Sequence, residues 1–519
     1  MPLSGPPLKQ PADVVDLLRI GLESNPDDVA LASAGMRWTW GELETPANRL
    51  AGQLLALGLE PGDRVATLMP NRTALIIFYI ACFRAGLVVT PLNYRYTPRE
   101  IDHALEVSGA RMLFSHIERA ADWEASRFVG TLDRGVLVYG GVHGTAPRFE
   151  LMIGAGTGDE AFPTRAASEP AAIFFTSGST GPAKGVTHSV DSLGWMLAAA
   201  ASAFELTSDD IVLPGSSMSH VGSFIWALAG LSHGAGVVVA RNFDANEILP
   251  LLRAERPTVM CMIPAAMLKL VREHGATKED FASLRLCRCG SDKVPAELEA
   301  EFERLSGLQI DEGYGMTEVG LATLNPPSGP MKLGSIGLPV AGFELSVRDD
   351  DDAEVGTDEP GQLFMKTRAR MIGYWNDPEA TAKTIREGWL DSGDIMKVDT
   401  DGYLWFCGRK KQIIVHDGSN IFPQEVEEAL LEHPTVENVG VIGIHDLMHG
   451  ENVRAYVAVR DGVGRPKEQD LIDFARERVG YKAPEEIEFL DEIPLNPTGK
   501  VDRVTLKQLA EEAHHPLPR

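Results

Sequence analysis

Residues able to bind phosphate gather in an early glycine-rich stretch. Thr176 to Val186 reads TSGSTGPAKGV and directly follows the apolar run AAIFF. A strand that leads into such a loop commonly presents backbone N–H groups to an anion, and Lys184 adds a positive charge. The spacing is not that of a Walker loop, because Gly185 follows the lysine. Composition alone leaves two interpretations open, a phosphate-binding loop and a mobile surface loop.

A second stretch, Asp311 to Gly320, reads DEGYGMTEVG and combines a hydroxyl group with a carboxylate. Thr317 could donate a hydrogen bond to a phosphate oxygen. Glu318 could bind Mg²⁺, which proteins usually hold through one or two carboxylates together with substrate phosphates. The alternative is a strand-to-helix turn in which Thr317 only caps the helix.

Two more stretches with chemical potential lie towards the C-terminus. Asp394 stands in a glycine-containing turn and is suited to paired ribose hydroxyls, while Arg409 offers a planar fork for a phosphate or ribose oxygen. Lys500 follows a Pro/Gly turn within PLNPTGKVDR. Taken singly, each residue is equally compatible with a solvated surface charge.

Helix-like and strand-like segments alternate up to about residue 345 and must position these groups. GELETPANRLAGQLLALGL is amphipathic at helical spacing, and TALIIFYIACFRAG is typical of a buried helix. The short apolar runs LVVTPL and AAIFF are typical of core strands. The alternation predicts an α/β fold with mixed, largely parallel sheets and helices.

The pattern of predicted elements changes after about residue 335. Short alternating strands predict a small β-rich unit, and the segments that follow predict helix, strand, strand, helix in a compact α+β domain of roughly 110 residues. The charged segment GRKKQ, at 408–412, marks the boundary. We therefore predict a large N-terminal domain over 1–408, a connection over 409–412 and a small C-terminal domain over 413–519.

The bulk composition excludes several classes of protein. The net charge of −26 argues against nucleic acid or an anionic membrane as the main partner. Five scattered cysteines form neither a disulfide framework nor a zinc site. The N-terminus lacks a signal-peptide pattern and no run of about 20 apolar residues occurs, so we expect a cytoplasmic protein without a membrane span.

In this order, the four stretches resemble the signature of the adenylate-forming superfamily, which includes acyl-CoA synthetases, firefly luciferase and peptide-synthetase adenylation domains. The resemblance covers almost the whole chain, including WTWGELETPANRLAGQLLALGLEPGDRV and GYWNDPEATAKTI. It implies a two-step reaction. ATP and a carboxylic acid give an acyl-adenylate and pyrophosphate, and a thiol, usually that of CoA, then displaces AMP. ATP, Mg²⁺ and CoA are the implied cofactors.

The resemblance also implies roles for residues of the N-terminal domain. The residues that match the family's loop along the β,γ-phosphates are Thr176, Ser177, Gly178, Ser179, Thr180 and Lys184. Thr317 matches the contact to the α-phosphate and Glu318 the Mg²⁺ ligand. Gly313, Tyr314 and Gly315 match residues that flank the adenine and the acyl group.

The C-terminal motifs match the family's second set of roles. Asp394 would hold the ribose hydroxyls with Arg409 nearby, and Lys500 would bridge the acid and the nucleotide during adenylation. In the family the C-terminal domain rotates between the two steps, which makes it mobile and makes Lys411 the hinge. The rotation would remove Lys500 and bring the loop around Gly418 to the CoA tunnel.

The acid itself is only partly constrained by the sequence. The residues that would line the acyl pocket are His220, Gly222, Gly290, Ser291, Met316 and Gly320. The segment 216–224 lacks the aspartate that binds an α-amino group, so an α-amino acid is not expected. Small pocket residues favour a sizeable apolar acid, either medium- to long-chain or aromatic. RCGSDKVP, at 288–295, departs from the usual Gly-Gly-Ala-Pro and leaves this choice open.

The leading prediction is therefore an AMP-forming acyl-CoA ligase. The alternatives are a stand-alone adenylating enzyme that loads an acyl carrier protein, and a luciferase-type oxygenase. A degenerate nucleotide-binding regulator is disfavoured because all five charged motif residues are present: Lys184, Glu318, Asp394, Arg409 and Lys500. The expected partners are a small carboxylic acid, ATP and CoA, with a homodimer as one assembly compatible with the sequence.

Overall fold

The computed structural model describes residues 2–158, 161–176, 183–243, 245–273, 275–290, 294–416, 419–446, 450–496 and 499–514. The chain divides into two compact units. Unit 1 comprises Met1–Leu345, Met365–Asp391 and Gly402–Leu404, and unit 2 comprises Ser346–Phe364, Ser392–Asp401 and Trp405–Arg519. The predicted fold class is confirmed, with a large N-terminal part of mixed sheets and helices and a smaller α+β part. The boundary at residue 408 stays a prediction.

One sheet of unit 1 has the order β19-β9-β8-β5-β4-β6-β7. Its strands are β4 (Arg64–Leu68), β5 (Val88–Pro91), β6 (Met112–His116), β7 (Val136–Tyr139), β8 (Pro170–Thr176), β9 (Lys184–Ser189) and β19 (Gly373–Tyr374). The strands β8, β5, β4, β6 and β7, in this sheet order, are parallel to one another. Strand β9 pairs with β8 in the antiparallel direction. Strand β5 is buried along its whole length, as expected for a parallel strand covered on both faces.

The second sheet of unit 1 has the order β16-β15-β14-β13-β12-β10-β11-β2-β3. Its strands are β2 (Val29–Ser33), β3 (Met36–Thr39), β10 (Ile211–Gly215), β11 (Gly236–Val238), β12 (Val259–Met262), β13 (Leu286–Cys289), β14 (Ile310–Met316), β15 (Gly320–Leu324) and β16 (Leu338–Pro339). The strands from β2 to β14 are parallel, and those at the two ends are antiparallel.

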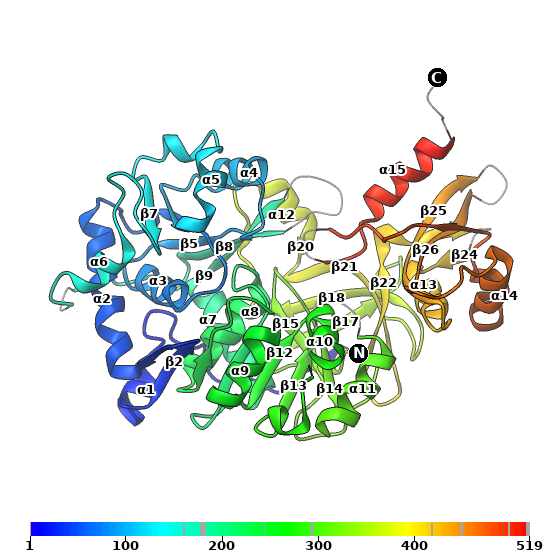
Figure 1. Cartoon of the computed structure of the whole chain (residues 1–519), viewed down its shortest axis with the longest axis horizontal. Coiled ribbons are helices and arrows are strands. Elements are labelled where there is room, and N and C mark those ends of the chain that lie inside the picture. The colour runs from blue at the N-terminus through cyan, green and yellow to red at the C-terminus, as the bar shows by residue number, and fades with distance from the viewer. Residues whose placement is uncertain are drawn as a thin grey trace. The chain divides into compact units, whose positions relative to one another are not determined.

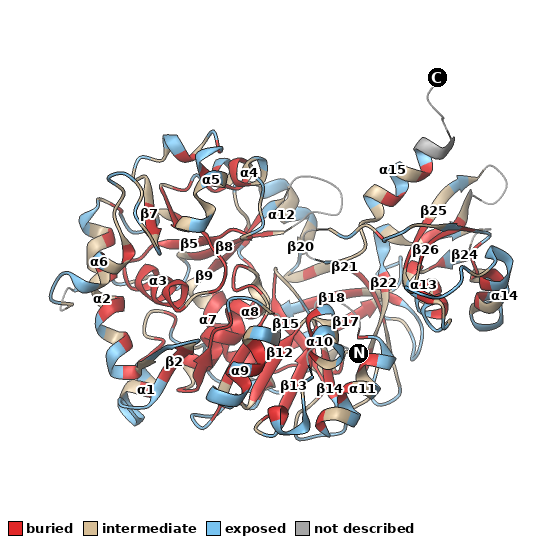
Figure 2. Cartoon of the chain, in the orientation of Figure 1, coloured by how far each residue is buried: buried red, intermediate tan, exposed pale blue. Residues whose placement is uncertain are grey.

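Two helices that are apolar on every side lie between these sheets (Figure 1). Helix α7 (Val190–Ala203) contacts β8 and β9 of one sheet and β15 of the other. Helix α8 (Val221–Ser232) contacts α7, β10, β11 and β15. Because a helix without a polar face must be buried all round, the sequences of α7 and α8 alone require cover on both sides. Figure 2 shows both helices as buried.

The remaining helices of unit 1 are α1 (Arg19–Ser24), α2 (Trp40–Ala56), α3 (Thr73–Arg84), α4 (Pro98–Ser108), α5 (Ala120–Glu124), α6 (Phe149–Gly154), α9 (Ala245–Glu255), α10 (Pro264–Arg272), α11 (Ala296–Ser306) and α12 (Pro378–Thr384). The predicted amphipathic helix is α2, which Thr39 begins with a capping box to Glu42. The predicted buried helix is α3, and every residue in it is buried. In the described residues, no helix is both long and apolar enough to cross a membrane.

A further sheet has the order β1-β17-β18-β21-β20, with β22 beside β21. The strands are β1 (Leu3–Ser4), β17 (Phe343–Arg348), β18 (Gly361–Thr367), β20 (Ile385–Arg386), β21 (Trp389–Val398) and β22 (Leu404–Arg409).

Unit 2 also contains the predicted helix, strand, strand, helix series. The elements are α13 (Pro423–Leu431), β25 (Val436–Asp446), β26 (Gly450–Val459) and α14 (Glu468–Val479), followed by β27 (Glu486–Phe489) and α15 (Arg503–His514), with β23 (Ile414–His416) and β24 (Ser419–Ile421) before them. The antiparallel pair β25–β26 carries one core, in which Val441, Val457 and Leu471 are fully buried.

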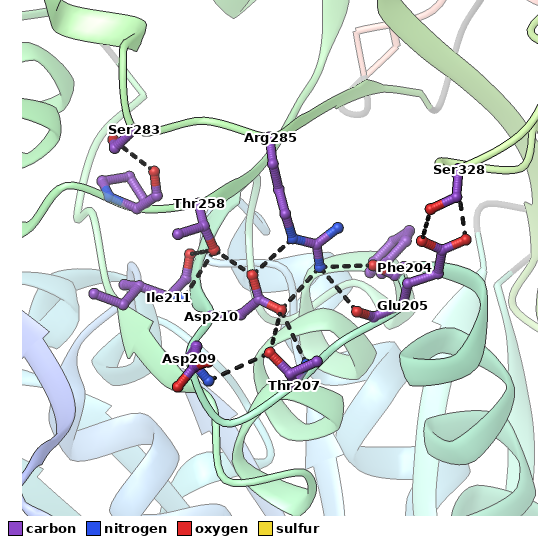
Figure 3. A network of polar contacts seen from close by, with 11 residues as sticks. Phe204, Glu205, Thr207, Asp209, Asp210, Ile211, Thr258, Ser283, Arg285 and Ser328 are labelled. Atoms are coloured by element: carbon purple, nitrogen blue, oxygen red, sulfur yellow. Dashed lines mark hydrogen bonds and ion pairs between the residues drawn. The ribbon is translucent and has the colours of Figure 1, made fainter.

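A polar network ties the amino ends of three parallel strands together (Figure 3). Asp210, just before β10, accepts hydrogen bonds from Arg285 Nε at 2.8 Å and from Thr258 Oγ1 at 2.6 Å. Thr258 precedes β12 and Arg285 precedes β13. Burial acts to raise the pKa of Asp210, but these hydrogen bonds outweigh it and lower the pKa below its ordinary value. The network therefore joins neighbouring strands at the sheet edge opposite to their carboxyl ends.

We expect Asp210→Ala to destabilise unit 1 by about 2–4 kcal/mol, because it leaves a partly buried guanidinium without its carboxylate. Because the folded-state pKa of Asp210 is lowered, the network stabilises the fold at neutral pH. That contribution is lost as the pH falls below the ordinary value of 3.8. Urea unfolding at pH 7 and pH 3 tests this, with Asp209→Ala at an exposed neighbouring position as the control. An equal loss in both variants would contradict the assignment.

Candidate functional site

The glycine-rich stretch joins two antiparallel strands. Thr176 ends β8 and Lys184 begins β9, and the two residues are register partners. A Walker loop instead leads from a strand into a helix, so the structure agrees with the sequence in excluding that motif. The predicted phosphate-loop residues Ser177, Gly178, Ser179 and Thr180 lie outside the described residues.

Lys184 reaches the threonine–glutamate motif through an aromatic ring. Its Nζ atom lies 5.0 Å from the centroid of the Tyr374 ring, a cation–π contact. The Tyr374 hydroxyl donates a hydrogen bond of 2.9 Å to Oε1 of Glu318. Burial, with the Glu318 charge, raises the pKa of Tyr374, so the phenol keeps its proton and remains a donor. Three segments far apart in sequence thus meet at one place.

Backbone pairing holds Tyr374 in that position. The short strand β19 is hydrogen-bonded to β9, with Tyr374 opposite Val186. On either side, the Trp375 N–H donates to the Gly185 carbonyl at 2.7 Å and the Met371 N–H donates to the Glu318 carbonyl at 2.7 Å. The 371–375 segment therefore links the strand that begins at Lys184 directly to the backbone of Glu318.

Thr317 and Glu318 lie in the turn of a β-hairpin between β14 and β15. The alternative in which Thr317 caps a helix is wrong. The chain can reverse here because Gly320 takes a φ of 76°, which favours glycine. Gly315 is needed as well, since a Cβ at that position would approach the Gly320 carbonyl oxygen to 2.3 Å. Glu318 is only 7% exposed, which places a carboxylate in a protected position next to the tyrosine.

A buried histidine that the sequence did not single out supports the same turn. His188 Nε2 lies 2.8 Å from the Thr317 carbonyl oxygen, and the residue is fully buried on β9. Burial lowers the pKa of His188 to about 4, so the neutral ring donates its Nε2–H to that carbonyl. No sequence signal marks this contact, because 129 residues separate its two partners.

The predicted pocket residues come from the start of α8 and from the carboxyl ends of β13 and β14. His220 precedes α8, and its Nε2 lies 3.5 Å from Asn93 Nδ2. Burial, and then the charge of Arg95, lower the pKa of His220, which favours the neutral ring. A Cβ on Gly222 would lie 3.5 Å from the Trp226 ring.

The other predicted pocket residues lie at the ends of two neighbouring strands, β13 and β14. Gly290 directly follows β13, and β14 contains the predicted residues Gly313, Tyr314, Gly315 and Met316. Ligands of open α/β sheets bind at this carboxyl edge, so the position agrees with a binding site. Gly320, at the start of β15, lies beside Met196 of α7, which its Cβ would meet at 2.5 Å. Ser291 lies outside the described residues.

Unit 2 brings two of its predicted residues together. Asp394 on β21 is 4% exposed, and its Oδ1 lies 3.3 Å from Nε of Arg409, the last residue of β22. Lys411 follows at once in a short 3₁₀ turn. Gly418 lies outside the described residues.

Lys500 is held on a short backbone turn. Its N–H donates to the Asn496 side chain at 3.1 Å, and its carbonyl oxygen accepts from the Asn496 N–H at 2.8 Å. Three residues later, Arg503 donates to both carboxylate oxygens of Glu427 at 2.6 and 2.7 Å. This partly buried bidentate pair fixes the segment after Lys500 to helix α13.

The residues present fit a magnesium ion only if it binds together with the nucleotide. Within the described residues, no three histidine, cysteine, aspartate or glutamate side chains gather into a ready metal site. The single protected carboxylate of Glu318 is nevertheless sufficient, because Mg²⁺ takes its other ligands from phosphates and water.

Comparison with known proteins gives consistent matches along the chain. The model of the AMP-binding enzyme family matches residues 19–375, and that of the AMP-binding enzyme C-terminal domain matches residues 425–500. A feruloyl-CoA synthase from Amycolatopsis sp is 34% identical, covering 92% of this chain and 95% of that protein. The fatty acid–[acyl-carrier-protein] ligase ScoC from Streptomyces coeruleorubidus is 32% identical, covering 93% and 94%. The crystal structure of the anthranilate CoA ligase AuaEII in complex with anthranoyl-AMP matches with a TM-score of 0.89 and 26% identity, over 98% of this chain and 99% of that one.

We expect His188→Leu to lower the kcat/KM for ATP by about tenfold, because the Thr317 carbonyl would lose its buried donor. His188→Gln keeps an N–H donor and should lose less. Because the folded pKa of His188 is lowered from 6.5 to about 4, stability is complete above pH 6.5 and declines as the pH falls towards 4. Steady-state kinetics and chemical unfolding of both variants between pH 4 and 8 check this. Identical pH dependence of stability in wild type and His188→Gln would oppose the assignment.

Proposed function

Because this chain belongs to the AMP-binding enzyme family and is an ATP-dependent, AMP-forming acyl-CoA ligase, we propose that its Lys184–Tyr374–Glu318 cluster binds the phosphates of ATP. The observation that carries the proposal is the chain of contacts from the Lys184 ammonium through the Tyr374 ring to the Glu318 carboxylate. It joins the two motifs expected at the phosphates in unit 1. The loop residues Thr176, Ser177, Gly178, Ser179 and Thr180 complete the proposed phosphate site.

The reaction explains why charge must be supplied at this point. A carboxylate oxygen of the acid attacks the α-phosphorus of ATP, pyrophosphate leaves, and the thiol of CoA then displaces AMP from the acyl carbon. The first step brings two anions together, so preorganised positive charge and hydrogen-bond donors must offset their repulsion. We assign Lys184 to the β,γ-phosphates and the Thr317 hydroxyl to the α-phosphate.

We assign the Mg²⁺ that accompanies ATP to Glu318. The Tyr374 hydrogen bond occupies one of its carboxylate oxygens and fixes the orientation of the other. Bound there, the ion would neutralise phosphate charge. Gly313, Tyr314 and Gly315 on β14 would flank the adenine, since this strand ends at the same turn.

In unit 2 we propose that Asp394 binds the ribose hydroxyls with Arg409 beside it, and that Lys500 bridges the acid and the nucleotide. An ion pair orients the Asp394 and Arg409 side chains, and hydrogen bonds to Asn496 hold the main chain of Lys500. We further propose domains over 1–408 and 413–519 joined by a hinge over 409–412, with Lys411 as the hinge residue. Gly418 is the proposed CoA contact after domain rotation.

The acyl pocket is proposed from His220, Gly222, Gly290, Ser291, Met316 and Gly320. Loading of a carrier protein is the second candidate, favoured by the ScoC relative. A luciferase-type oxygenase has no comparable relative among those named above. The expectations of a homodimer and of a cytoplasmic location stay predictions. Acid-dependent release of pyrophosphate across a panel of carboxylates, with and without CoA, tests the proposed function directly.

We expect Lys500→Ala to reduce acid-dependent pyrophosphate release by about a hundredfold or more, because it removes the charge that positions the acid and the phosphate. Thioester formation from supplied acyl-adenylate should remain near the wild-type rate. Each half-reaction is measured separately, with Lys507→Ala on the exposed side of α15 as the matched control. Equal loss of both half-reactions would disprove this role for Lys500.

We expect Lys411→Pro to slow thioester formation at least about tenfold more than adenylation, since proline restricts the φ change that a hinge needs. Lys411→Ala removes the same charge but leaves the backbone free, and so separates the two causes. Single-turnover measurements of both half-reactions provide the comparison. A Lys411→Pro enzyme with wild-type CoA turnover would rule out the hinge at this residue.

A further inference from the structure

An arginine side chain is buried among the proposed acyl-pocket residues. Arg288 lies on β13 between Cys287 and Cys289, and it is 4% exposed. Its two neighbours face the hydrophobic cluster beneath the sheet, so alternation along the strand directs Arg288 to the opposite face, where α8 packs.

The guanidinium group of Arg288 reaches the carboxyl ends of the strands, where the proposed pocket residues Gly290 and Gly313 lie. A Cβ built on Gly290 would meet its Nη1 at 3.0 Å, and one built on Gly313 would meet its Nη2 at 3.2 Å. The absence of a side chain at 290 makes room for the guanidinium, whereas a Cβ at 313 would first meet the Thr323 carbonyl oxygen at 2.6 Å. Its Cζ lies 5.0 Å from the Trp226 ring, and that ring also borders Gly222. The arginine thus approaches two of the residues assigned to the acyl and nucleotide site, and the Trp226 ring approaches a third.

Two buried donors of this cluster lack acceptors among the residues that the structure describes. Neither Nε of Arg288 nor Nε1 of Trp226 has a hydrogen-bond partner among the described residues, although both atoms are buried. Trp226 itself is 4% exposed. Unpaired buried donors cost free energy, and an unpaired buried charge costs more. The cation–π contact offsets only part of this cost.

The sheet supplies an incomplete countercharge for Arg288. Asp311, its register partner on β14, is fully buried, and its charge acts on the guanidinium, yet these two described residues form no ion pair. Burial raises the pKa of Asp311 to about 7, so that carboxylate is only partly ionised at neutral pH. A ligand oxygen would supply the acceptor that the protein leaves out.

We propose that Arg288 and Trp226 are specificity-determining residues that bind an oxygen acceptor on the acid, distal to its reacting carboxylate. The inference rests on the proposed acyl pocket. A carboxylate or a phenolic oxygen satisfies the guanidinium and the indole N–H together, since both groups only donate. The pocket thus selects oxygen-substituted acids over plain alkyl or aryl acids. This revises the expectation of a sizeable apolar acid, because the space that glycine leaves at 290 is filled by a charged group.

Matched acids provide the test. The ratio of kcat/KM for 3-(4-hydroxyphenyl)propanoate over 3-phenylpropanoate, and for 3-(4-carboxyphenyl)propanoate over 3-phenylpropanoate, is measured by pyrophosphate release. We expect at least one ratio to exceed about 30 in the wild-type enzyme, because a site built to bond an oxygen rejects the analogue that lacks it. The larger ratio identifies a phenolic or an anionic substituent. Ratios near one for both pairs in an active enzyme would overturn the inference.

Three variants separate specificity from folding. Arg288→Met should lower the preferred ratio by about tenfold or more, and Arg288→Lys, which keeps the charge, should lower it less. Trp226→Phe keeps an aromatic ring but loses the indole N–H together with part of the ring volume, and should lower the ratio severalfold. Trp123→Phe is its control, because Trp123 is equally buried and its Nε1 also lacks a partner among the described residues, but it packs in a different cluster.

The outcomes distinguish this inference from the proposed function. If no acid yields pyrophosphate, the proposed function fails. If acids are turned over but every variant leaves the ratios unchanged, Arg288 and Trp226 are structural and the inference fails. Thermal stability adds a second readout, because Arg288→Met removes an unpaired buried charge and should leave the melting temperature equal or higher. A lower melting temperature with unchanged ratios would also assign Arg288 a structural role.

Discussion

The burial of α7 and α8 between two sheets is the constraint on which the rest of unit 1 depends. Neither helix has a polar face, so both sheets must pack against them, and this fixes the two sheets relative to each other within the unit. The strand ends that carry Lys184 and Gly290 are thereby held in place by apolar packing. Polar contacts such as the one between Tyr374 and Glu318 then need only adjust side chains on a rigid base.

The proposed function requires cations at the phosphate site of a molecule whose net charge is strongly negative. The net charge of −26 repels a polyanion such as ATP at long range, and screening at physiological ionic strength limits this effect to about 8 Å. Binding must therefore depend on short-range donors and cations. Lys184 and Arg288 are the cations that we propose for binding ATP and the acid, respectively, and each one lies over an aromatic ring, that of Tyr374 or of Trp226. An aromatic face orients a cation without neutralising it, so both groups keep their charge for a ligand.

The sequence predicted the parts of the fold and site that depend on local pattern. Apolar runs located β5, β8 and the buried helix α3, and helical periodicity located α2, because burial dictates those patterns directly. The hairpin at Thr317 was not predicted, since a short glycine-rich turn is compatible with a following strand or a following helix. Contacts between residues that are far apart in the sequence could not be predicted from local pattern either. His188 and Tyr374 look like ordinary core residues until their partners are known.

The pairing of Gly290 with Arg288 has a consequence for how this chain can change. The three atoms nearest to a Cβ at position 290 all belong to the Arg288 guanidinium, whereas a Cβ at Gly313 would first meet the backbone of Thr323. Glycine at 313 is thus required by the main chain, but glycine at 290 is required only while an arginine occupies 288. Substitutions at 288 and 290 should be strongly non-additive. A larger residue at 290 should be tolerated better once the arginine has been replaced, so the order of mutations at these two positions matters.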